Sequence, residues 1–377
     1  MSWVHLAGSI PCLNILLIIF IAHLQVVTSH KPLKALFYSP TYGHSHLRFI
    51  GALAETFADA GHTAHLLIPE WYPSLKENGT TAIKRIIRIE PSFPSQYPKI
   101  EFFKKPFMKE EDMRGWHFFE NTSVQFCKDL LSNEKLLNEL RDEHYDIGYA
   151  ELIEYCPFGI FRLIKVKSMA IVSALPLIDT IVEAWGIPSP PSYVTDSLQS
   201  HVNAPFLSYW QRFLSLVTTF TKRRLFRHLL DAEDKLYKEM IGNEFPNLRD
   251  IIQNASVAFI NTPPLVEIPR PLSPKIINIG GLVSRLSRKK VLKSGVNMTL
   301  PKSDTVLFSL GSITNTSAMP SIMIEAMKEM VTRFPKIHFI LKMTTADSEK
   351  HFANFPNVQI FEWIDQIALL GVFYCLS

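Results

Sequence analysis

The sequence predicts an α/β protein in which strands of a parallel sheet alternate with helices. Three observations lead to this prediction. Residues 34–71 have the pattern of a strand, a helix and a second strand, a similar alternation continues to about residue 260, and another begins at residue 305. The chain has 377 residues, of which 47% are hydrophobic and 20% charged, and this composition and length are typical of a folded protein of two to three domains.

The first strand–helix–strand unit carries two histidines. An apolar run at 35–38 meets turn formers, and the following helix has apolar residues at three- and four-residue spacing: Leu47, Ile50, Leu53, Ala54 and Phe57. Gly61 stands at the expected C-terminal cap, and 64–68 predicts the second strand. His44 and His46 follow the first strand, where parallel sheets bind ligands, so each is either a general base or a surface turn residue.

The middle of the chain continues the alternating pattern. It predicts, in order, a loop at 90–109, a helix at 116–143, a strand at 145–150 ending at Glu151, a strand at 169–175, a proline-rich loop at 186–193, a helix at 205–241 and a strand at 256–260. The helix at 205–241 contains a basic cluster, Lys222, Arg223, Arg224 and Arg227. It is either partly buried with a solvated basic face or docked on a membrane surface.

The last part of the chain predicts a second, smaller α/β domain. A basic stretch at 286–304 is the candidate linker, so the predicted domains are 30–285 and 305–377. The second contains a strand at 305–310, a loop at Gly311 and Ser312, a helix at 321–334, and strands at 337–342 and 358–361. So few strands bury little apolar surface, which predicts that this domain is incomplete.

The N-terminal residues indicate the secretory pathway. Residues 1–29 contain an apolar stretch at 13–22 and resemble a signal peptide, with a retained anchor as the alternative. Five glycosylation sequons agree with this route: those of Asn78, Asn121, Asn254, Asn297 and Asn315. The expected location is therefore the endoplasmic reticulum, in its lumen or on its membrane, or outside the cell.

Several classes of site are disfavoured by composition. A formal net charge of +4 is small for this length, and without a nucleic-acid-binding motif it predicts no nucleic acid partner. Beyond the signal segment, Cys127, Cys156 and Cys375 are few and odd in number, so no disulfide framework is expected. No spacing of ligands predicts a metal site.

An ordered set of short motifs resembles a known family. The motifs are YGHSH at 42–46, AGH at 60–62, IPSPPSY at 187–193, NTPP at 261–264, FSLGS at 308–312 and WIDQ at 363–366. On these motifs the chain resembles the UDP-glycosyltransferases of the glucuronosyltransferase type, particularly the invertebrate members. The resemblance implies a GT-B-like fold of two Rossmann-like domains, of which the first binds an acceptor and the second a UDP-sugar.

The resemblance also implies a catalytic pair. The family's catalytic histidine lies fifteen residues before the glycine of the Gly-His motif, and counting back from Gly61 gives His46. Such a histidine takes the proton of the acceptor hydroxyl during attack. An aspartate orients it in the family, and the matching position is Glu151, which is one methylene longer. Asp146 and Glu154 remain alternatives for this role.

Four positions match the family's donor site. Gly311 and Ser312 match the turn that approaches the diphosphate, Trp363 matches a tryptophan that stacks on uracil, and Gln366 matches a polar residue that contacts the uridine. Asp365 stands where the family has proline. The resemblance implies UDP-glucuronate or UDP-glucose as co-substrate, a small lipophilic acceptor, and no further cofactor.

The sequence reaches Ser377 before the family's donor signature and membrane helix. One hypothesis is a transferase of small lipophilic hydroxyl compounds, acting with inversion, whose donor binding is impaired. The alternative is a non-catalytic isoform that binds acceptors or associates with full-length relatives through an exposed strand edge. A Rossmann oxidoreductase is disfavoured because no Gly-x-Gly-x-x-Gly turn follows the first strand.

Overall fold

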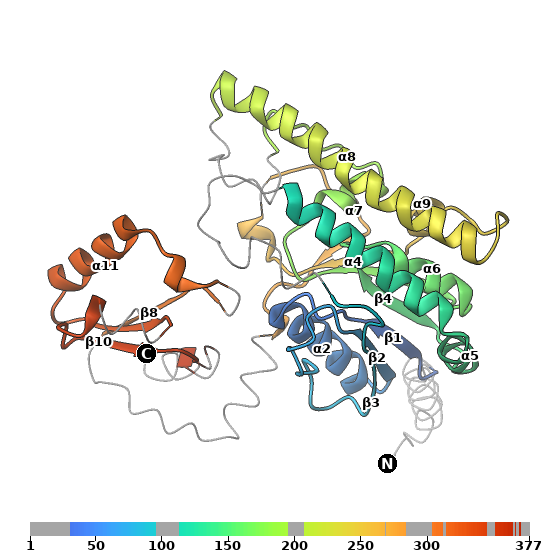
Figure 1. Ribbon diagram of the computed structural model, residues 1–377, viewed down its shortest axis with the longest axis horizontal. Helices are drawn as coiled ribbons and strands as arrows, with labels where there is room; N and C mark the ends of the chain where they lie inside the picture. Colours follow the sequence, from blue (N-terminus) through green and yellow to red (C-terminus); the bar gives the residue numbers. More distant parts are fainter. Residues whose placement is uncertain are drawn as a thin grey trace, which may run out of the picture.

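The structure is a computed structural model that contains two α/β units (Figure 1). It describes residues 31–95, 113–194, 207–267, 269–283, 304–311, 314–344, 351–364, 366 and 369–370. The predicted signal peptide, the linker up to residue 303, and Ser312 lie outside the described residues.

The larger unit is built on a parallel sheet of seven strands in the order β3-β2-β1-β4-β5-β6-β7. The strands are β1 (Lys34–Tyr38), β2 (Thr63–Pro69), β3 (Arg85–Ile89), β4 (Ile147–Glu151), β5 (Ser168–Ser173), β6 (Val257–Ile260) and β7 (Ile276–Asn278). The chain first builds outward from β1 to β3 and then returns to add β4 on the other side of β1. Open α/β sheets bind ligands where the strand order reverses in this way.

Helices cover both faces of this sheet (Figure 1). On one face α2 (His44–Asp59) packs its Leu47 and Ile50 against Phe37 of β1. The neighbouring β1 residue, Leu36, belongs to the core on the other face. That face carries α4 (Met113–Ser132), α5 (Glu134–Asp142), α6 (Cys156–Leu163), α8 (Tyr209–Met240) and α9 (Leu248–Gln253). Burial on both sides explains why β1 is apolar from Ala35 to Tyr38.

The smaller unit contains three parallel strands in the order β10-β9-β8. They are β8 (Thr305–Ser309), β9 (His338–Lys342) and β10 (Val358–Phe361). The helix α11 (Ser321–Arg333) packs Ile324, Met327 and Val331 against Phe339 and Leu341 of β9. Short elements complete the described fold: α7 (Asp179–Ala184), η2 (Pro264–Val266) and η3 (Thr316–Ala318).

Two local expectations need correction. The sequence predicted one helix over 116–143, but Asn133 separates α4 from α5 because its side chain accepts a hydrogen bond from the Leu136 amide at 3.0 Å and starts a new helix. The strands β3 and β7 were not predicted. Within the described residues, no helix combines the length and the apolar character needed to cross a bilayer.

The cysteines also depart from the expectation of no disulfide framework. Cys127 of α4 and Cys156 at the start of α6 form a disulfide, with their Cα atoms 5.7 Å apart. Cysteine number and spacing did not reveal this pair because packing between two helices brings the residues together. Cys12 and Cys375 lie outside the described residues.

Candidate active site

The centre of the candidate site is a contact between His46 and Glu151. His46 lies in the first turn of α2, directly after β1, and Glu151 is the last residue of β4. The two are 105 positions apart in sequence, yet the Nδ1 atom of His46 is 2.5 Å from Oε2 of Glu151. They meet because β1 and β4 are neighbours, with Phe37 opposite Tyr149, so their carboxyl ends share one edge.

Glu151 is held at both carboxylate oxygens. Its side chain is 1% exposed, and its Oε1 atom accepts a hydrogen bond of 2.7 Å from the backbone amide of Ala174. An ionised carboxylate can only accept, so we assign the shared proton to Nδ1 of His46 and the acceptor role to Oε2 of Glu151. This tautomer leaves the lone pair on Nε2 of His46, which is the arrangement that a general base requires. The longer glutamate side chain therefore reaches the histidine and the neighbouring strand together.

The electrostatic surroundings favour the charged form of His46. Burial lowers the pKa of its imidazole, but the charge of Glu151 and the hydrogen bond to it raise the pKa, and the net direction is upward. A base must be unprotonated to accept a proton, so the raised pKa extends to higher pH the range in which His46 is protonated.

The two alternative carboxylates have other partners. Asp146 lies just before β4, at the opposite end of the sheet from His46. Its carboxylate accepts hydrogen bonds from the Lys34 amide at 2.9 Å and from the Lys167 side chain at 2.6 Å. Glu154 accepts a hydrogen bond of 2.5 Å from the Tyr42 hydroxyl. Of the three candidate carboxylates, Glu151 is the one in hydrogen-bond contact with His46.

His44 is the first residue of α2 rather than a loop residue. Its Nδ1 atom lies 3.1 Å from Oε2 of Glu77, and its ring makes an edge contact with Trp363 at a centroid distance of 5.8 Å. Burial, and then the charge of Arg48, lower the pKa of His44, whereas Glu77 opposes this shift. A neutral His44 therefore lies between the two units.

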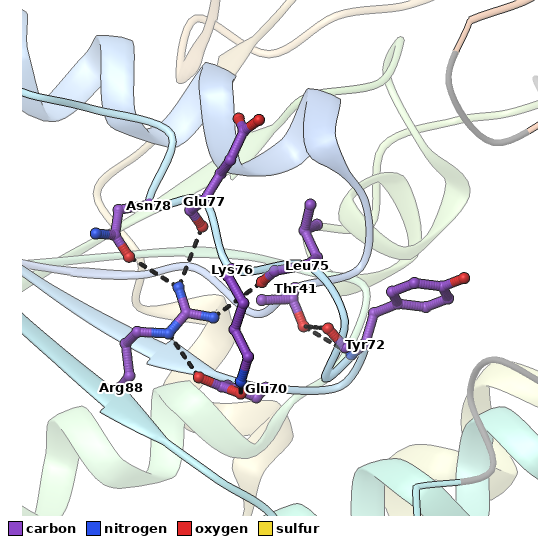
Figure 2. Close-up of polar contacts among 8 residues, drawn as sticks. All are labelled: Thr41, Glu70, Tyr72, Leu75, Lys76, Glu77, Asn78 and Arg88. Carbon is purple, nitrogen blue, oxygen red and sulfur yellow. Dashed lines mark hydrogen bonds and ion pairs between the residues drawn. The ribbon is translucent and has the colours of Figure 1, made fainter. Parts of the chain in front are cut away.

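The segment that carries Glu77 is anchored by Arg88 (Figure 2). Arg88 of β3 donates to Oε1 of Glu70 at 2.6 Å, to the side chain of Asn78 at 2.8 Å and to the carbonyls of Leu75 and Glu77. Close to the end of β1, the Thr41 hydroxyl accepts a bond of 2.7 Å from the Tyr72 amide (Figure 2). These bonds hold the loop after β2 beside the start of α2.

The predicted donor residues meet at the carboxyl end of the smaller sheet. Gln366 donates to the hydroxyl of Ser309, and the amide of Gly311 donates to the same hydroxyl at 3.3 Å. Trp363 is 56% exposed, so its ring is open to a ligand. Ser312 and Asp365 lie outside the described residues.

Lys342 was not among the predicted site residues. Its Nζ atom donates to the Gly311 carbonyl at 2.7 Å and lies 6.0 Å from the centroid of Trp363. It ends the strand predicted at 337–342, so its place at the same sheet edge was the available signal. No cluster of three or more potential metal ligands occurs among the residues that the structure describes.

With this geometry in place, the comparisons with known proteins assign the family. The profile described as "UDP-glucoronosyl and UDP-glucosyl transferase" matches residues 38–373, which include every described site residue. The chain belongs to this family. The resemblance on short motifs is thereby confirmed across most of the sequence.

Relatives in animals extend the match. The chain is 24% identical over 353 residues to ugt-47 of Caenorhabditis elegans, provisionally named a UDP-glucuronosyltransferase, covering 89% of this chain and 64% of that protein. It is 26% identical over 349 residues to human UDP-glucuronosyltransferase 3A2, covering 88% of this chain and 63% of that protein. The chain thus spans a little under two thirds of the length of these relatives.

A solved structure supports the fold. The glycotransferase of kitacinnamycin superposes with a TM-score of 0.56 at 12% sequence identity, covering 90% of this chain and 74% of that one. This likeness concerns the fold alone. The GT-B-like α/β fold that the resemblance implied is confirmed.

Proposed function

We propose that this chain is a UDP-glycosyltransferase of the glucuronosyltransferase type, which transfers a sugar to a hydroxyl of a small lipophilic acceptor with inversion. The observation that carries the proposal is the His46–Glu151 contact at the strand reversal of the larger sheet. Family membership supplies the reaction class, and the geometry supplies a base of suitable tautomer.

The mechanism assigns one role to each member of the pair. Nε2 of His46 takes the proton of the acceptor hydroxyl while the hydroxyl oxygen attacks the anomeric carbon of the sugar. The bond from that carbon to UDP breaks, and UDP leaves with the electron pair. Glu151 keeps Nδ1 protonated and stabilises the imidazolium that forms.

The residues of the smaller unit support a role in donor binding. The exposed ring of Trp363 offers a stacking surface for uracil, and the Gly311 turn with Lys342 offers an amide and a cation for the diphosphate. Tyr42 contacts His46 and belongs to a largely buried aromatic cluster with Trp71 and Phe119, so the surroundings of the base are apolar, which is compatible with a lipophilic acceptor.

A transfer assay tests the proposal. The purified chain is given UDP-glucuronate or UDP-glucose with a panel of phenols and aliphatic alcohols, and release of UDP is followed together with the product's anomeric configuration by proton NMR. The proposal expects an inverted glycoside and its loss in His46→Ala. A retained configuration, or equal turnover by His46→Ala, would contradict it.

The hypothesis of impaired donor binding stays a prediction, as does its non-catalytic alternative. Calorimetric titration with UDP measures donor binding directly, and both hypotheses expect this binding to be weak or absent. Acceptor binding and co-purification with a full-length relative, without UDP binding or turnover, would support the non-catalytic isoform. Turnover by the 377-residue chain at the rate of a full-length relative would exclude both.

We also propose that the chain enters the secretory pathway. The signal-like segment 1–29, the disulfide between Cys127 and Cys156, and the exposed sequon residue Asn254 support this route. Sensitivity to endoglycosidase H and sedimentation with microsomes are the expected results. An unglycosylated protein with free thiols in the cytosol would contradict the proposal.

Contact with a membrane surface is part of the same proposal. The first half of α8 exposes seven apolar residues: Tyr209, Trp210, Phe213, Leu214, Leu216, Val217 and Phe220. In Figure 1 this half extends past the end of α4, and exposed Arg224 and Arg227 follow it. An apolar face beside cations suits an anionic lipid surface.

Flotation with vesicles tests this contact. The chain is expected to float with vesicles containing phosphatidylserine, and Phe213→Asp/Phe220→Asp is expected to abolish flotation. Ile322→Asp is the matched control, because Ile322 is an exposed apolar residue of α11. Flotation that is equal in both variants would rule out α8 as the contact.

A further inference from the structure

A chain of buried polar groups lies next to the catalytic pair and takes no part in the proposed mechanism. Glu154 and Glu233 are both 0% exposed. The Tyr42 hydroxyl donates to Oε1 of Glu154 at 2.5 Å, and Oε2 of Glu154 lies 3.3 Å from the Ser123 hydroxyl. The same hydroxyl contacts Oε1 of Glu233, whose Oε2 accepts from the Tyr155 amide at 2.9 Å.

The pattern of donors and acceptors favours a proton on one of the two carboxyl groups. The Ser123 hydroxyl has a single proton and touches both carboxyl groups, so it can donate to only one of them. Glu233 already accepts a hydrogen bond from the backbone amide of Tyr155, and this bond stabilises its ionised form. The consistent chain therefore runs from Tyr42 to Glu154, from protonated Glu154 to Ser123, and from Ser123 to Glu233.

The surroundings favour the protonated form of Glu154. Burial, and then the charge of Glu233, raise the pKa of Glu154 to about 8. Burial also raises the pKa of Glu233 to about 7, against the hydrogen bonds from Ser123 and the backbone. Further ionisable groups that face this pair include Tyr38 of β1, Tyr237 of α8 and, on the side of Glu233, Glu120 of α4 and Tyr155. Each of these named groups is a phenol or a carboxyl.

Tyr42 connects this chain to the imidazole. Its ring packs against His46 at a centroid distance of 5.7 Å and an angle of 82°. The Tyr42 ring also packs against Trp71 at a centroid distance of 4.9 Å, and its hydroxyl donates the hydrogen bond to Glu154. The imidazole is thus held at Nδ1 by Glu151 and against its ring by Tyr42.

We propose that Glu154, acting through the Tyr42 hydroxyl, is a positioning residue that keeps the His46 imidazole aligned with Glu151. The inference rests on the proposed function for its effect on turnover, but not for its effect on the imidazole itself. Glu154 touches no reacting atom. Its role is to fix the tilt of Tyr42, and through it the direction in which Nε2 of His46 points.

Three variants separate positioning from plain packing. Tyr42→Phe removes the hydroxyl, and Glu154→Leu removes its acceptor. Glu154→Gln keeps an oxygen for Tyr42 and an N–H for Ser123, so it mimics the protonated glutamate. The matched control is Tyr145→Phe, which removes another buried phenol, one bonded to His65 at 2.9 Å and lying before β4 at the far end of the sheet.

Two measurements are made on each variant of the 377-residue chain. The pKa of His46 is followed by NMR in protein carrying ¹³C-histidine, with its signal assigned by its loss in His46→Ala. Turnover is measured as kcat and KM for transfer. Tyr42→Phe and Glu154→Leu are expected to lower the His46 pKa and to lower kcat about tenfold with little change in KM, because misaligned catalytic groups slow the chemical step.

Glu154→Gln is expected to restore the His46 pKa and most of the turnover, which a merely space-filling role would not predict. The inference is overturned if Tyr42→Phe moves the His46 pKa no more than Tyr145→Phe, or if Glu154→Gln behaves like Glu154→Leu. If Glu154→Leu does not fold, the two tyrosine variants still decide. If the wild-type chain transfers no sugar, the proposed function fails while the pKa comparison still decides the positioning role.

Discussion

The two halves of the candidate site differ in how completely they are assembled. The side chains of His46 and Glu151 are 13% and 1% exposed, and both oxygens of Glu151 have partners. On the smaller sheet, Trp363 is 56% exposed. The His46–Glu151 pair is therefore enclosed by the protein itself, whereas the ring of Trp363 stays open to a ligand. Changes in the first half should alter chemistry and pH dependence, and changes in the second should alter donor affinity.

Close packing also distinguishes the first half. Gly79 has a φ of +71°, and a Cβ atom there would lie 2.0 Å from the carbonyl oxygen of Leu47 in α2. The loop after β2 thus lies directly on the helix that carries His46. The same loop is tied to β3 through Arg88 (Figure 2).

The largest expected effect comes from removing the base. His46→Ala should lower kcat about 10²–10⁴-fold, because a positioned general base contributes that much to such a transfer. Steady-state kinetics with UDP-sugar and a phenol measure it, and an unchanged circular dichroism spectrum serves as the control. A variant within about threefold of the wild type would show that the enclosed half is not the catalytic one.

The carboxylate that orients the base should matter next. Glu151→Gln removes the charge that raises the His46 pKa, so the acid limb of kcat/KM should move to lower pH while kcat falls about 10²-fold or more. Glu151→Asp should also lose activity, because the shorter chain cannot reach His46 and the Ala174 amide together. An acid limb that stays in place in Glu151→Gln would separate the two residues functionally.

Removing the disulfide between Cys127 and Cys156 tests how much this covalent link contributes to the stability of the larger unit. Replacing Cys127 and Cys156 by serine should lower the free energy of unfolding by about 3–4 kcal/mol, the chain-entropy value for a separation of 29 residues. Guanidinium denaturation of the oxidised wild type and the double variant measures it. Equal midpoints would show that helix packing alone holds α4 and α6 together.

The exposed half is probed by Trp363→Ala. Loss of base stacking should weaken UDP binding by about 1–3 kcal/mol, with kcat at saturating donor nearly unchanged. Trp363→Phe keeps an aromatic face and is the matched control. If alanine lowers kcat and leaves UDP affinity intact, the indole acts on the chemistry and the division into two halves is wrong.

The last prediction concerns the dependence of stability on pH. Because the pKa of Glu154 is raised in the folded state, folding takes up a proton there. Stability is full below the ordinary glutamate pKa and declines as the pH rises through about 8. Urea denaturation from pH 5 to 9 should show this decline in the wild type and a flatter profile in Glu154→Gln. Identical profiles would place the proton elsewhere in the buried chain.

Much of the local structure was predictable from sequence. The apolar run before YGHSH and the helical spacing after it located β1, α2 and the cap at Gly61, whose φ is +88°. The strand ending at Glu151 and the strand at 358–361 were likewise predicted. The break at Asn133 was missed because its flanks are both helical in pattern, and β7 because three residues carry no periodicity.

By itself the sequence determined the α/β class, the positions of most elements, and a histidine and a carboxylate each placed after a strand. Strand periodicity, caps and turns are local properties, so they can be recognised in a short stretch of sequence. Only the tertiary structure decided that β4 lies beside β1, which brings the carboxylate of Glu151 to Nδ1 of His46. The structure also places Asp146 at the other end of the sheet, away from His46, and Glu154 in a hydrogen bond with the Tyr42 hydroxyl. Strand order depends on contacts between residues about a hundred positions apart, and these arise from burial in a common core.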